Sequence, residues 1–260
     1  MDLLVVGAGT MGRWFASAVA EPVDRVAFVD RDRDAAEAAV EAVDGHAAVL
    51  DASGTDPGDE RETFTAVCIA VPMAAVGDAV AAHADRAERA ILDVAGVAEP
   101  AVEAMRTYAP DRERASLHPL FSSANEPGTV ATVVDDGGPV VDRLLEALRS
   151  RGNRLVETTA SEHDEAMETI QARAHAAVLA YALTADEVPE GFRTPVSRRL
   201  AEAVEDVTGG NSRVYADVQE AFDGAEDIAA AARRIADADR EAFERLYAET
   251  TEAFDGEDQG

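Results

Sequence analysis

The stretch Leu3-Leu4-Val5-Val6-Gly7-Ala8-Gly9-Thr10-Met11-Gly12 decides the fold of this chain. An apolar strand runs directly into the pattern G-x-G-x-x-G, a helical segment follows, and a second strand over 25–30 ends in Asp30. In this context the first glycine permits a tight turn, the second lets the backbone approach a pyrophosphate, and the third lets helix and strand pack closely. We therefore expect a dinucleotide whose pyrophosphate lies at the helix N-terminus, near Thr10 and Met11.

The acid that closes the second strand bears on the choice of cofactor. Asp30 is placed to accept both ribose hydroxyl protons, which favours NAD because a carboxylate repels a 2′-phosphate. Arg31 and Arg33 follow it, and an arginine at this place can hold that phosphate, so NADP stays open. We expect NAD.

The composition is strongly acidic. The 260 residues carry a net charge of −29, from 52 acids and 23 bases, and every base is an arginine. Such a surface does not attract nucleic acid or an anionic membrane by charge. The acids are spread through periodic segments that are 47% apolar overall, which argues against a disordered acidic tail. We interpret the acidity as adaptation to a salt-rich cytoplasm, where ions screen self-repulsion. A melting temperature that does not rise in molar KCl would contradict this.

Other residue types narrow the class further. The single cysteine, Cys68, lies in an apolar run and is expected to be a buried small side chain without a disulfide. The run from 66 to 76 is interrupted by Pro72 and is too short to span a bilayer, and no signal peptide is visible. The five histidines have no metal-ligand spacing, so we expect no metal. These features predict a soluble cytoplasmic protein.

Periodicity predicts alternating strands and helices in the first half and helices alone after about residue 159. The apolar run 64–71 is typical of a central parallel strand covered on both faces. We therefore predict an α/β fold: a doubly wound, Rossmann-type parallel sheet over residues 1–159, the dinucleotide-binding domain, with a second all-helical domain over 160–260. Strands are expected at 2–6, 25–30, 46–50, 64–71, 90–94, 115–117, 130–134 and 154–158, and helices at 10–20, 32–43, 161–183, 194–207, 212–222 and 226–252, the third of these capped by Ser161 with Asp164.

Ligands of doubly wound sheets bind beyond the carboxyl ends of the strands. Val71 and Pro72 end one strand and are expected along the nicotinamide half of the cofactor, and Gly96 follows the next strand. His118, in the segment Ser116–Phe121, follows the sixth strand. An imidazole there can accept a proton near neutral pH, as alcohol oxidation requires. From position alone, a histidine that is merely hydrogen-bonded in a loop is an equal alternative.

The helical half offers further candidates. At 100° per residue, Gln171 and His175 share a helix face, whereas His163 points elsewhere. Taken by itself, His175 is interpreted as a polar residue at an interface between two helices. Arg198 and Arg199, near the start of a helix, are either counter-charges on a solvated surface or a fork for a substrate carboxylate.

Together these motifs resemble the prephenate/arogenate dehydrogenase family of tyrosine biosynthesis over nearly the whole chain. The segment SLHPLF is similar to the family's His-Pro motif. SEHDEAMETIQARAHAAVLAYAL resembles its E-H-D-x-x-M-x-x-I-Q-x-x-x-H helix, and FRTPVSRRLAEAVEDVTGGNSRVYADVQEAF resembles its S-P-x-Y-R and Y-A-D-I segment. The acidic composition is similar to that of a halophilic archaeal member.

The resemblance implies an NAD(P)-dependent oxidative decarboxylation of prephenate to 4-hydroxyphenylpyruvate. It implies that His118 removes the proton of the ring hydroxyl, that Arg198, beside Arg199, binds a substrate carboxylate, and that His175 lines the substrate pocket with Gln171 nearby. It also implies a homodimer formed through the helical domain. We expect the imidazole and the guanidinium to meet over the reactive ring of the cofactor.

The chain departs from the family after the fifth strand. Where the family commonly has Ser-Val-Lys, it has Gly96-Val97-Ala98, so a serine hydroxyl is missing. The sequence leaves open whether prephenate or arogenate is the substrate. A β-hydroxyacid or imine-reducing dehydrogenase is an alternative, but such enzymes usually rely on a lysine or another helical motif. A redox-sensing NAD-binding protein without catalysis is a second alternative.

Overall fold

The computed structural model describes residues 1–43, 47–49 and 62–255. These residues form two compact units, Met1–Met167 and Glu168–Gly260, which we describe separately. The boundary predicted at 159/160 lies one helix earlier, so helix α6 (Ala160–Met167) belongs to unit 1. The roles expected of the two domains stay predictions.

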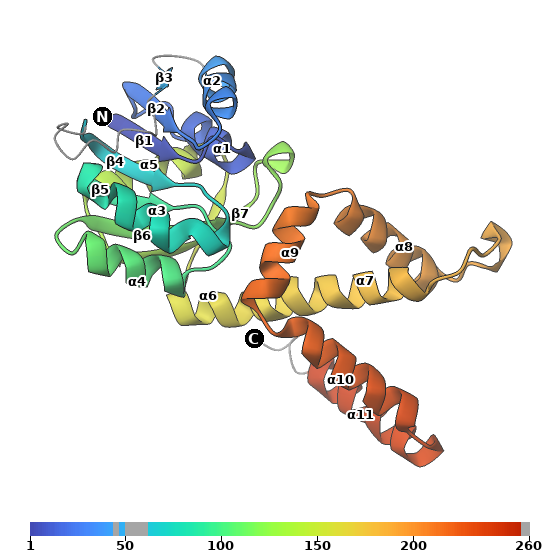
Figure 1. Ribbon diagram of the computed structural model, residues 1–260. Coiled ribbons are helices and arrows are strands. Elements are labelled where there is room, and N and C mark those ends of the chain that lie inside the picture. The colour runs from blue at the N-terminus through green and yellow to red at the C-terminus, as the bar shows by residue number, and fades with distance from the viewer. Residues whose placement is uncertain (44–46, 50–61, 256–260) are drawn as a thin grey trace. The chain divides into compact units, whose positions relative to one another are not determined.

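Unit 1 is built around one sheet whose described residues form eight strands in the order β3-β2-β1-β4-β5-β6-β7-β8 (Figure 1). Neighbouring strands are parallel except β6 and β7, which are antiparallel, so β7 and β8 run against the other six. The doubly wound sheet confirms the predicted fold class, but it is mostly rather than wholly parallel. The strands are β1 (Asp2–Val6), β2 (Arg25–Val29), β3 (Ala47–Val49), β4 (Phe64–Ile69), β5 (Ala87–Asp93), β6 (Glu113–Pro119), β7 (Thr129–Asp136) and β8 (Arg154–Glu157).

The predicted strands differ from the observed ones mainly at their ends. The second and fourth predicted strands, 25–30 and 64–71, stop one and two residues early, whereas the fifth begins at Ala87 instead of 90. Of the predicted strand 46–50, the end residues lie outside the described part of the chain.

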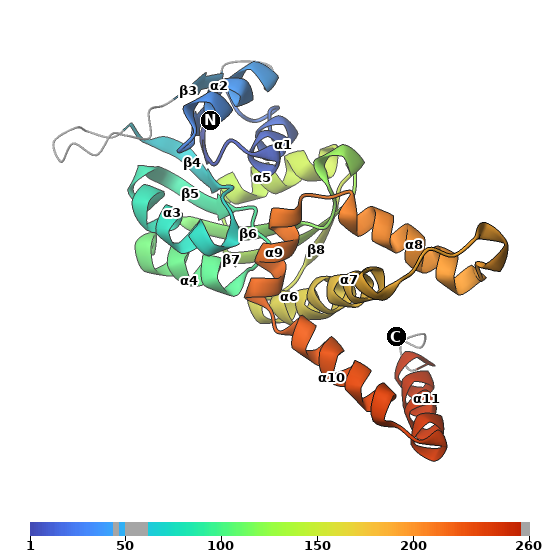
Figure 2. The ribbon, with the colours of Figure 1, turned by 45° about the vertical axis from the view of Figure 1, so that its right-hand side comes forward.

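Helices cover both faces of the sheet, so the central strands β1 and β4 are mainly apolar and buried, whereas β8 is largely exposed. Along β1, Leu3 and Val5 pack into one hydrophobic cluster and Leu4 and Val6 into the other. The first cluster lies under α1, α2 and α5, and the second under α3 and α4, which lie side by side (Figure 2). The helices of unit 1 other than α6 are α1 (Thr10–Ala18), α2 (Arg33–Ala42), α3 (Val76–His83), α4 (Glu99–Tyr108) and α5 (Pro139–Ser150).

Helices α4 and α5 begin without a capping side chain of their own and receive a cap from another element. The residues before α4 and α5 are Ala98 and Gly138, and neither supplies a side-chain cap. At α5 the carboxylate of Glu113, on β6, accepts hydrogen bonds from the N–H groups of Val140 and Val141 at 2.8 Å each. A carboxylate from another element thus replaces the local cap and suits the positive end of the helix dipole.

The cap of α6 differs from the predicted pair Ser161 and Asp164. The hydroxyl of Thr159 accepts a hydrogen bond from Glu162 N at 3.2 Å, and the Glu162 carboxylate accepts one from Thr159 N at 3.1 Å. The N-cap is thus two residues earlier than the predicted Ser161, and Asp164 is left available for other contacts.

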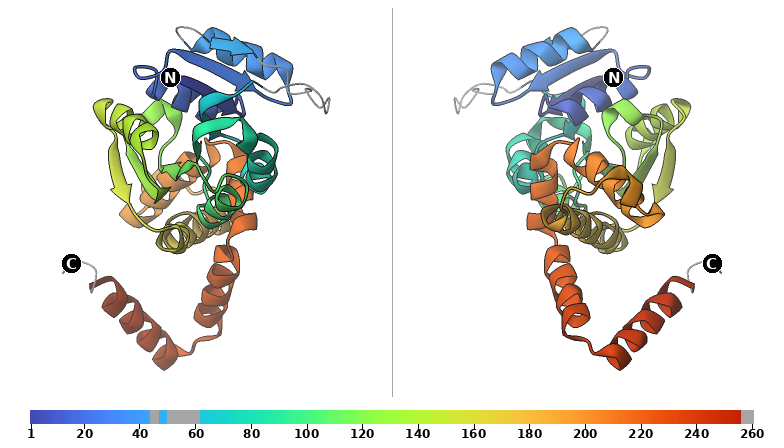
Figure 3. Two further views of the ribbon diagram at one scale, coloured as in Figure 1. Left: turned by 90° about the vertical axis from the view of Figure 1, so that its left-hand side faces the viewer. Right: turned by 90° about the vertical axis from the view of Figure 1, so that its right-hand side faces the viewer.

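Unit 2 is helical. The predicted helix 161–183 is continued here as a π-helical segment, Glu168–Arg173, and then as an α-helix. The predicted helices 194–207 and 212–222 are confirmed. The predicted helix 226–252 is wrong in its middle: Ala238 is extended and the Asp239 carboxylate caps a new helix by accepting from Ala242 N at 2.8 Å. Figure 3 shows these last two helices as the arms of a V. The helices are α7 (Ala174–Thr184), α8 (Pro195–Thr208), α9 (Ser212–Ala221), α10 (Gly224–Asp237) and α11 (Arg240–Asp255).

Across the described ranges, each helix is either too short or too polar to traverse a bilayer.

The close packing of β1 against α1 gives a test of the fold. A Cβ on Gly12 would lie 2.1 Å from the carbonyl oxygen of Gly7, a backbone atom that cannot move away. Gly12→Ala should therefore lower the free energy of unfolding by about 1–3 kcal/mol. Gly77→Ala is the matched control, because no atom lies within 4 Å of its new Cβ and alanine favours the helix by up to about 1 kcal/mol. Urea unfolding at fixed KCl measures both, and a Gly12 variant as stable as the parent would contradict this packing.

Candidate functional site

The predicted site residues of unit 1 lie at one edge of the sheet. Strands β1, β2, β4, β5 and β6 run in the same direction, so their carboxyl ends meet there. The residues that follow or end these strands are the loop Gly7–Gly12, Asp30 with Arg31, Val71 with Pro72, Gly96, and His118.

The glycine loop has the geometry of an open cradle. Gly7 has a φ of 103°, and a Cβ there would lie 2.2 Å from the carbonyl oxygen of Ala70, so only glycine fits the turn. Around a Cβ placed on Gly9 there is no atom within 4 Å. Helix α1 begins at Thr10, next to this open space, with its first N–H groups unbonded within the helix. The loop therefore fits a pyrophosphate lying over Gly9.

Asp30 is held in a defined orientation. Its Oδ2 accepts a hydrogen bond from Ala8 N at 2.7 Å and its Oδ1 accepts one from Asp32 N at 2.9 Å. A carboxylate has about four acceptor positions, so two remain for ribose hydroxyls. Arg31 is exposed, whereas Arg33 Nε lies 2.9 Å from the carboxylate of Glu37 within α2.

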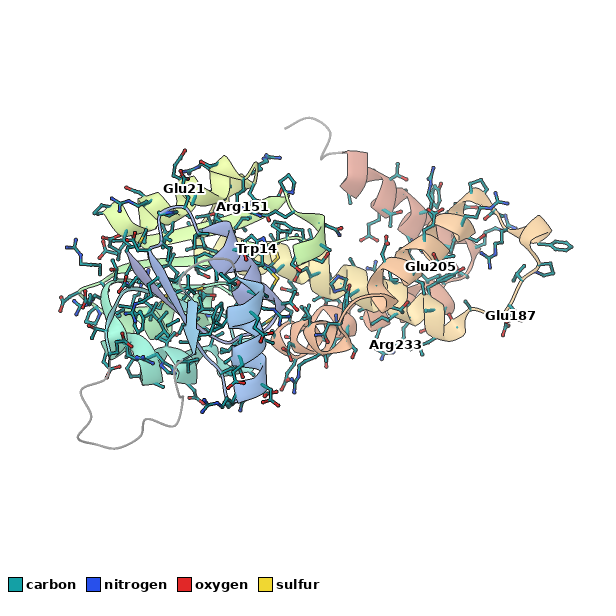
Figure 4. The ribbon with its side chains drawn as sticks, turned by 90° about the horizontal axis from the view of Figure 1, so that it is seen from above. Trp14, Glu21, Arg151, Glu187, Glu205 and Arg233 are labelled. Carbon is teal, nitrogen blue, oxygen red and sulfur yellow. The ribbon has the colours of Figure 1, made fainter. Side chains whose placement is uncertain are left out.

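His118 lies near the end of β6, and the loop after it is tied down at two places. Phe121 packs edge-on against Trp14 of α1, with ring centroids 5.5 Å apart and an angle of 82°. Further along the loop, the carboxylate of Glu126 accepts from Arg151, at the end of α5, at 2.7 Å (Figure 4 labels Trp14 and Arg151). These contacts fix the loop that follows His118.

The ring of His118 contacts a second histidine. His118 Nδ1 lies 3.0 Å from His163 Nε2, and the ring centroids are 5.2 Å apart. Burial lowers the pKa of His118 to about 3, with His163 adding to the effect and Asp164 opposing it. His118 is therefore a neutral imidazole at pH 7, in the state that accepts a proton.

His163, on α6, contacts His118 at this edge, although the sequence predicted only that it points away from the helix face of His175. It is buried, with 3% of its surface exposed, and its Nδ1 lies 2.7 Å from Asp164 Oδ1. Asp164 in turn accepts hydrogen bonds from Ala98 N at 2.8 Å and Glu99 N at 3.0 Å, at the start of α4. Burial alone would raise the pKa of Asp164, but the bonds from His163 and these backbone groups hold it below its usual range.

The place of the missing serine is filled by a thioether. A Cβ on Gly96 would lie 2.4 Å from Met73 Cε and 3.7 Å from His118 Nε2. Met73 belongs to a short 3₁₀ helix, Met73–Ala75, that directly follows Pro72 and was not predicted. The edge of the site beside the Nε2 atom of His118 is thus apolar, in agreement with the missing serine hydroxyl.

A buried acid, Asp93, ends β5 beneath this edge. It is 0% exposed, and its Oδ2 accepts a hydrogen bond from Ala95 N at 2.8 Å. Burial raises its pKa to about 7, against the hydrogen bonds of Ala95 and Ser116 that lower it. The same burial, with the charge of Asp93, raises the pKa of the Cys68 thiol, so this cysteine is a buried, unreactive side chain as expected.

The remaining candidates lie in unit 2. Gln171 is in the π-helical segment, so the spacing of 100° per residue used to place it beside His175 does not apply there. His175, on α7, stacks edge-on against Tyr215 of α9 with centroids 4.6 Å apart, and burial lowers its pKa. Arg198 and Arg199 are exposed in the first turn of α8. Their expected substrate contacts stay predictions.

Metal-ligating side chains do not gather in groups of three or more anywhere in the part of the chain that the structure describes.

The family of this chain follows from its similarity to an individual known protein, since no family model matches it. It is 30% identical over 237 residues to a 4-amino-4-deoxyprephenate dehydrogenase of Streptomyces pristinaespiralis, an alignment that spans 86% of this chain and 78% of the relative. The chain belongs to the prephenate dehydrogenase family.

Solved structures share the fold of this family member. Prephenate dehydrogenase from A. aeolicus, in complex with hydroxyphenyl propionate and NAD+, superposes with a TM-score of 0.68 at 13% identity and 98% coverage of both chains. Arogenate dehydrogenase from Synechocystis superposes with a TM-score of 0.60 at 16% identity, covering 98% of this chain and 99% of that one. At such identities the likeness concerns the fold, a Rossmann-type sheet followed by helices.

The raised pKa of Asp93 predicts a pH dependence of stability. The carboxyl titrates near pH 7 in the folded protein and near its ordinary value of 3.8 when unfolded. Its neutral form thus stabilises the fold fully below about pH 4, and this contribution is lost as the pH rises to about 7. Asp93→Asn keeps an acceptor for Ala95 N and does not ionise. Its unfolding free energy relative to the parent should rise by up to about 4 kcal/mol between pH 4 and 7.

Urea unfolding at several pH values and one KCl concentration measures this difference. Asp111→Asn, which removes an exposed acid, controls for net charge. A constant difference between the Asp93 variant and the parent from pH 4 to 7 would rule out a buried carboxyl with a raised pKa.

Proposed function

We propose that this member of the prephenate dehydrogenase family catalyses the NAD-dependent oxidative decarboxylation of prephenate to 4-hydroxyphenylpyruvate. The observation that carries the proposal is His118, a neutral imidazole on β6 at the same sheet edge as the open glycine loop. A proton acceptor beside a dinucleotide cradle is what oxidation of a ring alcohol requires.

The residues at the sheet edge fit NAD. Gly9 leaves room for the pyrophosphate, and Asp30, oriented by Ala8 N, offers acceptors to the ribose. A 2′-phosphate would lie against the Asp30 carboxylate, and the guanidinium of Arg33 is engaged by Glu37. When bound, NAD supplies the acceptor for a hydride. We therefore propose NAD as the preferred cofactor, with Thr10, Met11, Val71 and Pro72 lining its site.

In the proposed reaction His118 accepts the proton of the C4 hydroxyl as C4 gives up its hydride. Loss of CO2 from C1 then makes the ring aromatic, which drives the step, so the protein mainly orients the reacting groups. Arg198, with Arg199 beside it, would hold a substrate carboxylate by paired N–H groups. His175 and Gln171 are proposed to line the substrate site.

A second candidate substrate carries an amino group in place of the C4 hydroxyl. The Streptomyces relative is named for 4-amino-4-deoxyprephenate. At this edge of the site, Gly96 and the thioether of Met73 stand where the family commonly has a serine hydroxyl. A C4 amine, like a C4 hydroxyl, can donate a hydrogen bond directly to His118, so the name of the relative is what favours this second candidate. Arogenate, which differs in its side chain and not at C4, remains a third candidate.

A homodimer formed through unit 2, in the cytoplasm, completes the proposal. Large apolar side chains of this unit are exposed in the single chain, among them Leu183 at 87%, Phe192 at 78% and Tyr247 at 69%. Such surface favours association with a partner.

NADH formation tests the reaction directly. The purified chain in molar KCl should reduce NAD when given prephenate, with a lower KM for NAD than for NADP, and release 4-hydroxyphenylpyruvate. Parallel assays with arogenate and 4-amino-4-deoxyprephenate rank the candidates by kcat/KM. NAD binding without turnover of any of the three would favour a sensor and end the proposal.

Two substitutions separate the proposed roles. His118→Asn should lower kcat by about 10²–10⁴ and leave the Kd for NAD unchanged, because it removes the proton acceptor alone. Arg198→Ala should mainly raise the KM for the substrate, because it removes a carboxylate contact. His83→Asn and Arg240→Ala are matched controls from outside the proposed site. A loss confined to kcat in the Arg198 variant would contradict its assignment.

A further inference from the structure

Two side chains, His163 and Asp164, link the imidazole of His118 to the backbone of α4. The contacts are His118 Nδ1 to His163 Nε2 at 3.0 Å, His163 Nδ1 to Asp164 Oδ1 at 2.7 Å, and Asp164 to the N–H groups of Ala98 and Glu99. His163 is 3% exposed, so water does not compete for its ring nitrogens. All the groups lie in unit 1.

The direction of each hydrogen bond follows from the end of this chain of contacts. An ionised carboxylate only accepts, and both oxygens of Asp164 already accept from backbone N–H groups. The His163 Nδ1 atom must therefore carry a proton and donate it to Asp164. When the imidazole of His163 is neutral, its other nitrogen is an acceptor, so His163 Nε2 accepts the N–H of His118 Nδ1.

We propose that His163 and Asp164 are positioning residues that fix His118 as its Nδ1–H tautomer. The lone pair of His118 then lies on Nε2, the nitrogen 3.7 Å from the Cβ position of Gly96. The opposite tautomer would place a proton on Nε2 and would direct two lone pairs, those of His118 Nδ1 and His163 Nε2, at each other.

This inference rests on the proposed function for its catalytic meaning. The substrate O–H bond breaks as its proton passes to His118 Nε2, while the C4–H electron pair leaves as hydride for NAD. The imidazolium that forms on His118 keeps its Nδ1–H bond to His163. The Asp164 carboxylate, on the far side of His163, stabilises the positive charge. Neither His163 nor Asp164 needs to touch the substrate for this.

The carboxylate of Asp164 is held in place by its own hydrogen bonds to α4. Asp164 supplies the cap that Ala98 cannot give to α4, and the helix dipole there favours a negative charge. Because His163 and Asp164 are adjacent on α6, the same contact that caps α4 sets the position of the His163 ring.

The tautomers of the histidines can be measured without substrate or cofactor. In the full chain labelled with ¹⁵N-histidine, long-range ¹H–¹⁵N spectra at pH 7 should show His118 and His163 each protonated on Nδ1 and unprotonated on Nε2. The single variants His118→Asn, His163→Leu and His83→Asn assign the signals. A proton on Nε2 of His118, or a doubly protonated His163, would overturn the proposal.

His163→Leu tests the consequence for turnover. Without its acceptor, His118 should lose the fixed tautomer in the same spectra, and kcat should fall by about 10–10³-fold with the Kd for NAD unchanged. A variant that keeps the His118 Nδ1–H signal and the kcat of the parent would overturn the proposed positioning of His118 by His163 and Asp164.

Failure of the proposed positioning of His118 and failure of the proposed function are distinguishable. The spectra can confirm the tautomers in a protein that oxidises none of the three substrates. In that case the proposed function fails, and the positioning of His118 by His163 and Asp164 stands. Turnover with His118 protonated on Nε2 would give the reverse result.

Discussion

The carboxylate of Asp164 makes the contacts on which the proposed catalytic edge of unit 1 depends. It accepts the first N–H groups of α4, which Ala98 cannot cap, and it holds the ring of His163 from the same helix turn. Without it, the first turn of α4 would have unsatisfied donors and His163 would have no fixed proton. Glu113 caps α5 in the same way, but that cap does not position a histidine ring. The comparison shows how an ordinary structural device is also used to orient a proposed catalytic base.

Burial favours the neutral form of two titratable groups at this edge, although it shifts their pKa values in opposite directions. His118 is pushed toward its neutral form, which accepts a proton, and Asp93 is pushed toward its own neutral form, which spares the core a charge. Both shifts arise mainly from desolvation, since removal of water penalises whichever form is charged. The glycine loop adds no charge of its own and offers instead an open backbone, at Gly9, to an anionic group.

Much of unit 1 was predictable because its signals are local. The glycines, Asp30 and the apolar strand runs each have a fixed relation to the parallel sheet. The reversal of β7 and β8 was not predictable, because a short apolar run has no direction. The break at Ala238 lacks glycine or proline, and its only signal is the capping residue Asp239. The π-helical turn around Gln171 has no composition signal that we recognise. His163 was missed because its direction was judged only against His175 on the same helix, whereas its partner, His118, is 45 residues away in sequence.

The account therefore rests on a proton acceptor, oriented from behind by two side chains, at the edge where a nicotinamide would lie. A crystal structure of the chain with NAD and 4-hydroxyphenylpyruvate tests it most directly. We expect the pyrophosphate to lie over Gly9 and the phenolic oxygen to lie within hydrogen-bonding distance of His118 Nε2. A phenolic oxygen bound by other groups, with His118 facing away from the product, would contradict it.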